Sequence, residues 1–294
     1  MESLRDIRTR MTSVQKTMKI TNAMYLMASS RLKRARAKLA ATEPYFNKLQ
    51  YVIVDILNHT EEGRQRYLAT DRSIPPDEVR YGYVVITSDK GLAGAYNLNV
   101  CRLAEQKMQT TKHNKIYCIG YTGMHYFEKR PELGDLTEEY CYSAAEPETW
   151  RARQLAEYLV QEFLEERLDE VIIVYTKMVN ALTAEAELMQ ILPLTQGMFP
   201  VTPLEDSRSY STDYSPSPME VLDRVAPNFV KGLLFGAMVE AFASEQNARM
   251  QAMQNATDNA GEIVEKLALQ YNRVRQAAIT TEINEVVAGA NAQE

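Results

Sequence analysis

The chain has 294 residues, of which 45% are hydrophobic and 24% are charged, and its formal net charge is −6 at pH 7. This composition is typical of folded proteins and excludes intrinsic disorder and fibrous repeats. Three cysteines are too few for a disulfide scaffold and indicate a reducing compartment. The longest apolar run, Gly232 to Val239, is shorter than the ~18 residues of a membrane-spanning helix. The sequence therefore predicts a chain that does not cross a membrane.

The charge is distributed unevenly along the chain. Residues 1–50 contain eleven Lys and Arg but only three acidic residues, so the rest of the chain is strongly acidic. Such a basic segment can meet an acidic protein, an anionic membrane surface or nucleic acid. An ordinary solvated helix face explains the same charges equally well.

The N-terminal segment has apolar residues at alternating steps of three and four over its first 56 residues. The series consists of Leu4, Ile7, Met11, Val14, Met18, Thr21, Tyr25, Ala28, Leu32, Ala35, Leu39, Thr42, Phe46, Leu49, Ile53 and Ile56. A 3.5-residue repeat of this length predicts a left-handed coiled coil. Pro44 interrupts the backbone hydrogen bonding, so we expect a kink or a loosened turn there.

The C-terminal segment supplies a second seam. No proline follows Pro227, and apolar residues recur at Met250, Met253, Ala256, Ala260, Ile263, Leu267, Tyr271, Val274 and Ala278. These steps are irregular and predict a stutter in the supercoil. Two long seams at opposite ends of one chain most simply pair with each other in antiparallel orientation.

The middle of the chain changes to short runs of β-branched and aromatic residues. Runs at 81–87, 115–121 and 171–176 resemble buried parallel strands, another strand-like run covers 184–192, and helical stretches lie at 98–112, 122–130 and 149–166. This alternation predicts an α/β sheet with right-handed crossovers. Residues 196–218 are rich in Ser, Pro and Asp and are expected to form a long loop.

The predicted fold class is therefore α/β, with a long antiparallel coiled coil of terminal helices and a Rossmann-like α/β head. We expect the first coiled-coil helix at 1–57, the head at 78–195 and the second helix at 217–290.

A glycine-bearing turn, Ser88-Asp-Lys-Gly-Leu-Ala-Gly-Ala-Tyr-Asn97, follows the first predicted strand. Such turns bind phosphates in many α/β enzymes. The spacing Gly91-x-x-Gly94 matches neither the dinucleotide fingerprint nor the P-loop, so a structural tight turn is favoured over a phosphate cradle. The three histidines form no metal-binding spacing with the cysteines, and the sequence nominates no catalytic residues, metal or cofactor.

Several motifs resemble those of the gamma subunit of F-type ATP synthase, of the bacterial type. They are Lys19-Ile-Thr-Asn-Ala-Met24, the turn at 88–97, Ala243-Ser-Glu-Gln-Asn-Ala-Arg-Met-Gln-Ala-Met-Gln-Asn-Ala-Thr-Asp-Asn259 and Tyr271-Asn-Arg-Val-Arg-Gln-Ala-Ala-Ile-Thr-Thr-Glu-Ile283. The match covers both ends and the centre of the chain.

This resemblance implies a central rotor shaft without an active site of its own. Ion flow would turn a membrane ring of c subunits, and the shaft would turn with it inside alternating alpha and beta subunits, with epsilon beside the head. The resemblance also implies one copy per complex, no nucleic acid, no cofactor and a peripheral position on the cytoplasmic face of the bacterial membrane.

The same resemblance nominates residues for contact with the catalytic ring: Lys19, Met24, Arg249, Arg275, Gln276, Thr280 and Glu282. The basic residues Lys19, Arg31, Lys33, Arg34 and Arg36 are expected to face acidic segments of the beta subunits. In the head turn, the nominated residues are Asp89, Gly91 and Gly94.

Two other classes of function remain open at this stage. One is a coiled-coil α/β enzyme that binds a phosphate ligand at the turn between Gly91 and Gly94. The other is a nucleic-acid-binding protein that uses the basic first helix.

Overall fold

The computed structural model describes residues 3–59, 66–68, 74–180, 183–195 and 214–291. Most of the predicted loop at 196–218 lies outside these residues. Two long helices, α1 (Leu4–His59) and α5 (Pro218–Asn291), form the first and last elements of the chain. The chain divides into two compact units, one comprising residues up to Ser30 together with those from Arg249 onward, the other comprising Arg31–Ala248.

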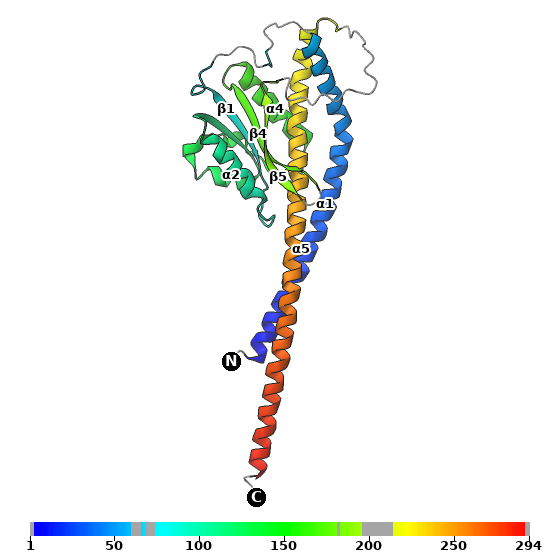
Figure 1. Ribbon diagram of the computed structural model, residues 1–294, viewed down its shortest axis with the longest axis vertical. Coiled ribbons are helices and arrows are strands. Elements are labelled where there is room, and N and C mark those ends of the chain that lie inside the picture. The colour runs from blue at the N-terminus through cyan, green and yellow to red at the C-terminus, as the bar shows by residue number, and fades with distance from the viewer. Residues whose placement is uncertain (1–2, 60–65, 69–73, 181–182, 196–213, 292–294) are drawn as a thin grey trace. The chain divides into compact units, whose positions relative to one another are not determined.

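The first unit pairs the beginning of α1 with the later part of α5. The two segments run in opposite directions, dark blue against orange in Figure 1. On α1, Ile7 and Ala28 are almost fully buried, as the heptad pattern predicts, while on α5 Met253 and Leu267 are the matching buried residues. Each helix therefore buries one narrow stripe, which is the packing of a coiled coil.

The seam of α5 differs from the predicted one at Ile263. Ile263 is 41% exposed, while Val264 and Thr257 take the inward positions. The residues Met253, Thr257, Ala260, Val264, Leu267, Tyr271, Val274 and Ala278 are buried or half-buried and step by four and three, and Ala256, Gly261 and Ala268 beside them are half-buried as well. The predicted seam is therefore wrong at Ile263, whose place is taken by Val264, while the predicted Ala256 shares its level of the seam with the polar Thr257.

A hydrogen bond between two threonines explains this polar position. Thr21 and Thr257 face each other with their Oγ1 atoms 2.7 Å apart. Thr257 Oγ1 can also donate to the carbonyl oxygen of Met253, at 2.8 Å, and Thr21 Oγ1 to that of Met18, at 3.1 Å. One hydroxyl thus donates across the seam and the other donates to its own helix. A polar pair at one level of an apolar seam favours a single register.

The second unit contains a five-stranded sheet in the order β3-β2-β1-β4-β5. Its strands are β1 (Arg80–Ile86), β2 (His113–Ile119), β3 (Asp135–Leu136), β4 (Glu170–Met178) and β5 (Ala184–Leu192). Strands β1 to β4 are parallel and β5 is antiparallel to β4. The predicted strands are all present, while β3 was missed because it has only two residues.

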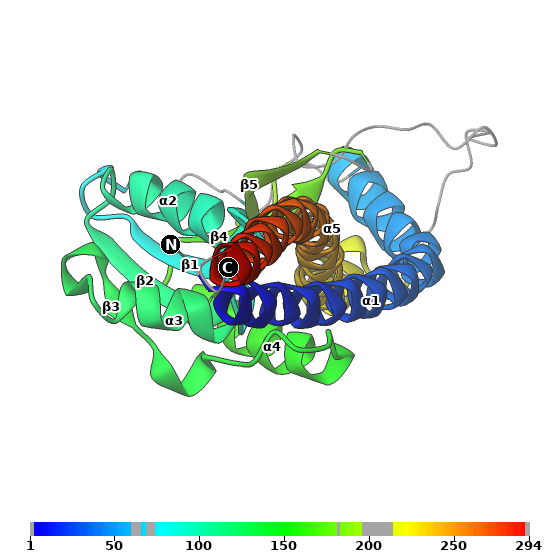
Figure 2. The same ribbon diagram turned by 90° about the horizontal axis from the view of Figure 1, so that it is seen from below.

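Helices cover both faces of this sheet. They are α2 (Tyr96–Met108), α3 (Tyr121–Phe127) and α4 (Thr149–Leu164), and short 3-10 turns at Pro131–Leu133 and Glu138–Tyr140 flank β3. One hydrophobic cluster joins α2 and α3 to the sheet, and a second joins α4, the first part of α5 and the end of α1 to the opposite face. Figure 2 shows α2 and α4 on opposite sides of the strands. Connections that change face in this way give a doubly wound sheet whose switch point lies between β1 and β4.

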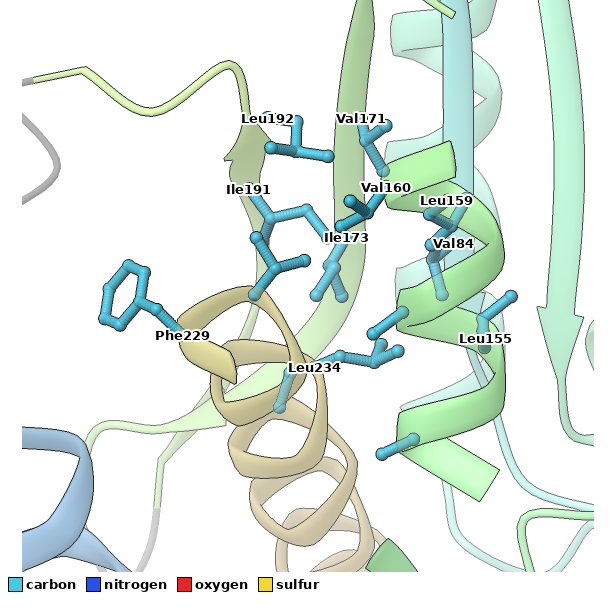
Figure 3. Packing of buried hydrophobic residues seen from close by; sticks show 14 of the residues in the cluster. Val84, Leu155, Leu159, Val160, Val171, Ile173, Ile191, Leu192, Phe229 and Leu234 are labelled. Atoms are coloured by element: carbon cyan, nitrogen blue, oxygen red, sulfur yellow. The ribbon is translucent and has the colours of Figure 1, made fainter. Parts of the chain in front are cut away.

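The second cluster is the larger one and depends on α5. Leu234 of α5 packs toward α4, which carries Leu155 and Leu159, and Ile173 and Ile191 of the sheet lie above it, while the Phe229 ring points away from the strands (Figure 3). By length and composition α5 could also cross a membrane, but 61% of its most apolar window is buried within the described structure. Burial against the sheet accounts for that apolar composition.

Helix α1 remains helical through Pro44. Near this point α1 lies close to α5. A Cβ added at Gly232 of α5 would lie only 2.0 Å from the Phe46 ring of α1. A glycine is therefore required at this position, whereas Gly236, one turn later, has nothing within 4 Å of its added Cβ.

This contrast gives a matched pair of substitutions. Gly232→Ala is expected to lower the free energy of unfolding by about 1–3 kcal/mol, because the Phe46 ring must move out of a packed position. Gly236→Ala is expected to raise it by up to about 1 kcal/mol, since alanine favours the helix. Urea unfolding of the full chain measures both, and equal effects of the two substitutions would contradict the close approach.

Candidate functional site

The residues nominated for contact with a catalytic ring lie on both helices of the first unit. Lys19, Arg275, Gln276, Thr280 and Glu282 are exposed. The Thr280 hydroxyl donates to the carbonyl oxygen of Gln276 at 2.9 Å, so it already has a partner within its own helix. Met24 and Arg249 are half-buried. The nominated side chains therefore lie along the outer surface of the pair rather than converging on one pocket.

The same unit exposes large apolar side chains, of which only Met27 was expected at an interface from its place off the seam. The most exposed are Ile20, Leu26, Met27, Leu269, Ile283, Val286 and Val287, with exposed fractions between 52% and 72%. The first four fall between seam positions, which is the signal that could have identified them, and the last three follow the final seam residue, Ala278. Exposed apolar surface of this kind is typical of a protein–protein interface.

The basic residues of α1 do not all face outward. In the second unit, Arg36 donates to Met178 Sδ at 3.3 Å and Lys38 donates to the carbonyl oxygen of Pro147. Arg34 approaches Glu146 at 4.0 Å, as an exposed ion pair. Two of the five residues expected to face beta subunits, Arg34 and Arg36, thus have partners within their own unit.

The nominated turn follows β1 at the switch point of the sheet. Ser88 and Asn97 are joined reciprocally: the Ser88 N–H donates to Asn97 Oδ1, and Asn97 Nδ2 donates to Ser88 Oγ, each at 2.8 Å. The Ser88 hydroxyl donates in turn to the carbonyl oxygen of Lys90 at 2.7 Å. These bonds close the turn onto the first turn of α2.

Asp89 connects this turn to two other segments. Its carboxylate accepts hydrogen bonds from the Ala144 N–H at 2.8 Å, the Ser143 hydroxyl at 2.5 Å and the Tyr121 N–H at 3.3 Å. Tyr121 begins α3, so the carboxylate also lies near the positive end of a short helix. Asp89 thus joins three segments at the carboxyl edge of the sheet.

The two nominated glycines have different roles. Gly94 has φ +58°, in the left-handed region that favours glycine, and Leu92 has φ +64° in the same turn. Gly91 has open space around an added Cβ. The close approaches lie in a different Gly-x-x-Gly segment: a Cβ added at Gly120 would lie 2.4 Å from the carbonyl oxygen of Thr87, and one at Gly123 2.8 Å from Thr87 Oγ1.

Helix α5 closes the crevice where an α/β enzyme would hold a phosphate. The Tyr96 hydroxyl at the start of α2 donates to the carbonyl oxygen of Ala241 at 3.1 Å. The remaining cavity is only about 10 Å³ and is lined by Met238 and Phe242 of α5 together with the acidic Glu146 and Glu245. Such a space has room for about one water molecule, and its two carboxylates would repel an anion. The geometry therefore opposes phosphate binding and favours a structural turn.

Comparisons with known proteins identify the family. A family model described as ATP synthase matches residues 3–293. The ATP synthase gamma chain of Ruminiclostridium cellulolyticum is 40% identical over 295 residues, covering 99% of each chain. The sodium-ion-specific ATP synthase gamma chain of Acetobacterium woodii is 37% identical over 305 residues and also covers 99% of each. The chain belongs to the ATP synthase gamma chain family.

Solved structures support the fold assignment. A chain of the Euglena gracilis mitochondrial ATP synthase aligns with a TM-score of 0.62 at 16% identity, covering 99% of this chain and 94% of that one. A chain of the Tetrahymena thermophila mitochondrial ATP synthase central stalk and c ring aligns with a TM-score of 0.56 at 19% identity, covering 81% and 99%. Family membership confirms the function predicted from the motifs, that of a non-catalytic gamma subunit, and the mixed α/β fold class is confirmed as well.

The Asp89 contacts yield a stability prediction. Asp89→Ala leaves the Ala144 and Tyr121 N–H groups without their acceptor and is expected to lower the free energy of unfolding by about 2–3 kcal/mol. Asp135→Ala, which removes an exposed carboxylate from β3, is the matched control and should change it by less than about 0.5 kcal/mol. Denaturant unfolding distinguishes the two, and an Asp89 effect as small as the control would show that the three segments are held by other contacts.

Proposed function

We propose that this chain is the central shaft that couples ion flow through a membrane c ring to ATP synthesis or hydrolysis on the beta subunits. In this proposal the first unit lies inside the ring of alpha and beta subunits, and the α/β head contacts epsilon and the c ring. The complex is membrane-bound, and we place the chain at the cytoplasmic face of a bacterial membrane as a peripheral subunit in one copy.

The observation that carries this proposal is the outer surface of the first unit. Large apolar side chains and charged residues alternate there on both helices, and residues 282–288 of α5 are exposed without exception. A surface of this kind in a membrane-complex subunit is best explained by a protein sleeve that covers it. Copurification of alpha and beta subunits with a tagged chain tests the assignment directly.

Rotary coupling also requires that torque pass along the chain. Helices α1 and α5 each continue from one compact unit into the other without interruption. The shared coiled-coil core and the Thr21–Thr257 hydrogen bond in the first unit resist sliding of one helix along the other. The alternative function, phosphate binding at the Gly91–Gly94 turn, has no support in the acidic, closed cavity beside it.

The first functional prediction concerns Arg275, which is exposed and makes no ion pair with any residue of the described chain. A planar guanidinium can bind a carboxylate with two parallel hydrogen bonds, and an ammonium group cannot. We expect Arg275→Lys to lower ATP turnover of the assembled complex about tenfold, the loss of one charge-assisted hydrogen bond. Arg153→Lys in α4, where the arginine already pairs with Glu157 at 2.7 Å, should leave turnover unchanged.

Assembly is measured first, by subunit stoichiometry, so that a loss of turnover is not a loss of complex. If Arg275→Lys turns over normally in a fully assembled complex, the bidentate contact does not exist. Arg275→Gln then establishes whether the positive charge alone matters.

The second functional prediction concerns Met24, a half-buried residue beside the seam residue Tyr25. A lysine at this position would find acidic partners on one beta subunit and form a contact of roughly 1.5–3 kcal/mol that must break at every rotational step. We expect Met24→Lys to retain ATP hydrolysis and to lower the ion gradient formed per ATP hydrolysed. Met24→Leu, which conserves volume, should retain both.

The measurement is the ratio of ion gradient to ATP hydrolysed in reconstituted membranes. Equal ratios for the lysine and leucine variants would place Met24 in the coiled-coil core instead of at the ring contact.

A further inference from the structure

All three cysteines of the chain gather on one side of the sheet, although they are far apart in sequence. Cys101 of α2 and Cys118 of β2 belong to the cluster between the sheet and helices α2 and α3, and Cys141 packs against that cluster. Cys101 and Cys118 are buried and Cys141 is half-buried. All three are free thiols.

Backbone pairing places two of these cysteines opposite each other. The segment after β3 returns beside the end of β2 as an isolated parallel bridge between Ile119 and Tyr142. Tyr142 N–H donates to the carbonyl oxygen of Cys118 at 3.0 Å, and Gly120 N–H donates to that of Tyr142 at 2.6 Å. This register makes Cys118 and Cys141 direct neighbours on adjacent strands.

The side chains of this pair point to the same face. Ile119 and Tyr142 contact the cluster on the α4 and α5 side, while Cys118 and Cys141 contact the cluster on the α2 and α3 side. Neighbouring strands lie ~4.8 Å apart. Disulfides join residues whose Cα atoms are about 4.4–6.8 Å apart, a range that includes the spacing of neighbouring strands.

The two thiols differ in reactivity. The neighbouring Cys118 thiol, opposed by partial burial, lowers the pKa of Cys141 to about 7, and the Cys141 thiol lies 3.4 Å from the carbonyl oxygen of Thr137, to which it can donate. The same interaction and burial raise the pKa of Cys118 well above its ordinary value. Burial raises the pKa of Cys101 to about 12. Near neutral pH, Cys141 is therefore the thiol with the largest thiolate fraction, and it is also the most accessible of the three.

We propose that Cys118 and Cys141 form an oxidisable thiol pair, a modification site that hydrogen peroxide converts into an intramolecular disulfide. The Cys141 thiolate attacks one peroxide oxygen and becomes a sulfenic acid, and the other oxygen leaves as hydroxide and is protonated to water. The Cys118 sulfur then attacks the sulfenic sulfur, its proton combines with the departing hydroxide, and a second water forms. Both thiols are oxidised and one peroxide is reduced, so the step balances without another reagent.

The bond would fasten a segment that carries other contacts. Ser143 and Ala144, immediately after Cys141, are the groups that Asp89 holds at the carboxyl edge of the sheet. Pro147 and Glu146 follow, and they contact Lys38 and Arg34 of α1 in the same unit. Oxidation therefore adds a covalent link next to the hydrogen bonds that join the turn, the sheet edge and α1. This inference does not depend on the proposed rotary function.

Peptide mapping tests the proposal on the full chain. The reduced protein is treated with hydrogen peroxide, the remaining thiols are alkylated, and trypsin separates the cysteines into peptides 91–102, 116–129 and 130–151. The expected product joins peptides 116–129 and 130–151, while peptide 91–102 is alkylated only after unfolding. Cys101→Ala should form the same linked product, as the matched control from the same cluster.

A link between Cys101 and Cys118, or over-oxidation of Cys141 without any linked peptide, would overturn the proposal. A second measurement uses the reduced protein. Alkylation of Cys141 should be half-maximal near pH 7, and Cys118→Ala should slow it about tenfold at pH 7 because the neighbouring thiol is lost. Cys118→Ser, which keeps a donor, should restore most of the rate. Equal rates in all three proteins would also overturn the proposal, since they would mean that the two side chains do not interact.

Discussion

Helix α5, of 74 residues, is buried on all sides along one stretch and along a single stripe in another, and the rest of the structure depends on this constraint. Between Ala237 and Asn247 almost every residue is buried, so this stretch is enclosed on all sides within the second unit. From Met253 to Ala278 the buried and half-buried residues follow one stripe, as in a helix with one partner. A helix held on all sides in one unit and bound along one stripe in the other cannot turn about its own axis independently of either. That property is what a rotating shaft requires.

The turn after β1 also helps to hold the second unit together. In nucleotide-binding α/β folds the carboxyl edge at the switch point is open to a ligand. Here Tyr96 bonds to the backbone of α5, and Asp89 holds the segment around Ser143 against the turn. The most motif-like part of the sequence is therefore devoted to holding the head together, and this agrees with a subunit that has no active site.

The periodic parts of the structure could be predicted from sequence, and the parts set by distant contacts could not. All sixteen seam positions of α1 are buried or half-buried, because each one follows the same local repeat. On α5 the inward position of Val264 in place of Ile263 and the hydrogen bond of Thr257 both involve the other helix, which no local pattern reveals. The acceptor role of Asp89 depends on residues 54 and 55 positions away. Strand β3 was too short for a pattern, and Gly120 and Gly123 were missed because their need for glycine arises from Thr87, directly after the neighbouring strand β1. The ring-contact residues remain predictions.

Direct observation of rotation tests the central claim. A gold particle would be attached through Lys112→Cys, whose native side chain is 63% exposed in the head, in a chain that also carries Cys141→Ala so that the half-buried thiol is not labelled. The alpha and beta subunits of the assembled complex would be fixed to a surface and supplied with ATP. We expect the particle to turn continuously in one direction while ATP is hydrolysed and to stop when ATP is removed. Hydrolysis at the normal rate with a stationary particle would contradict the account.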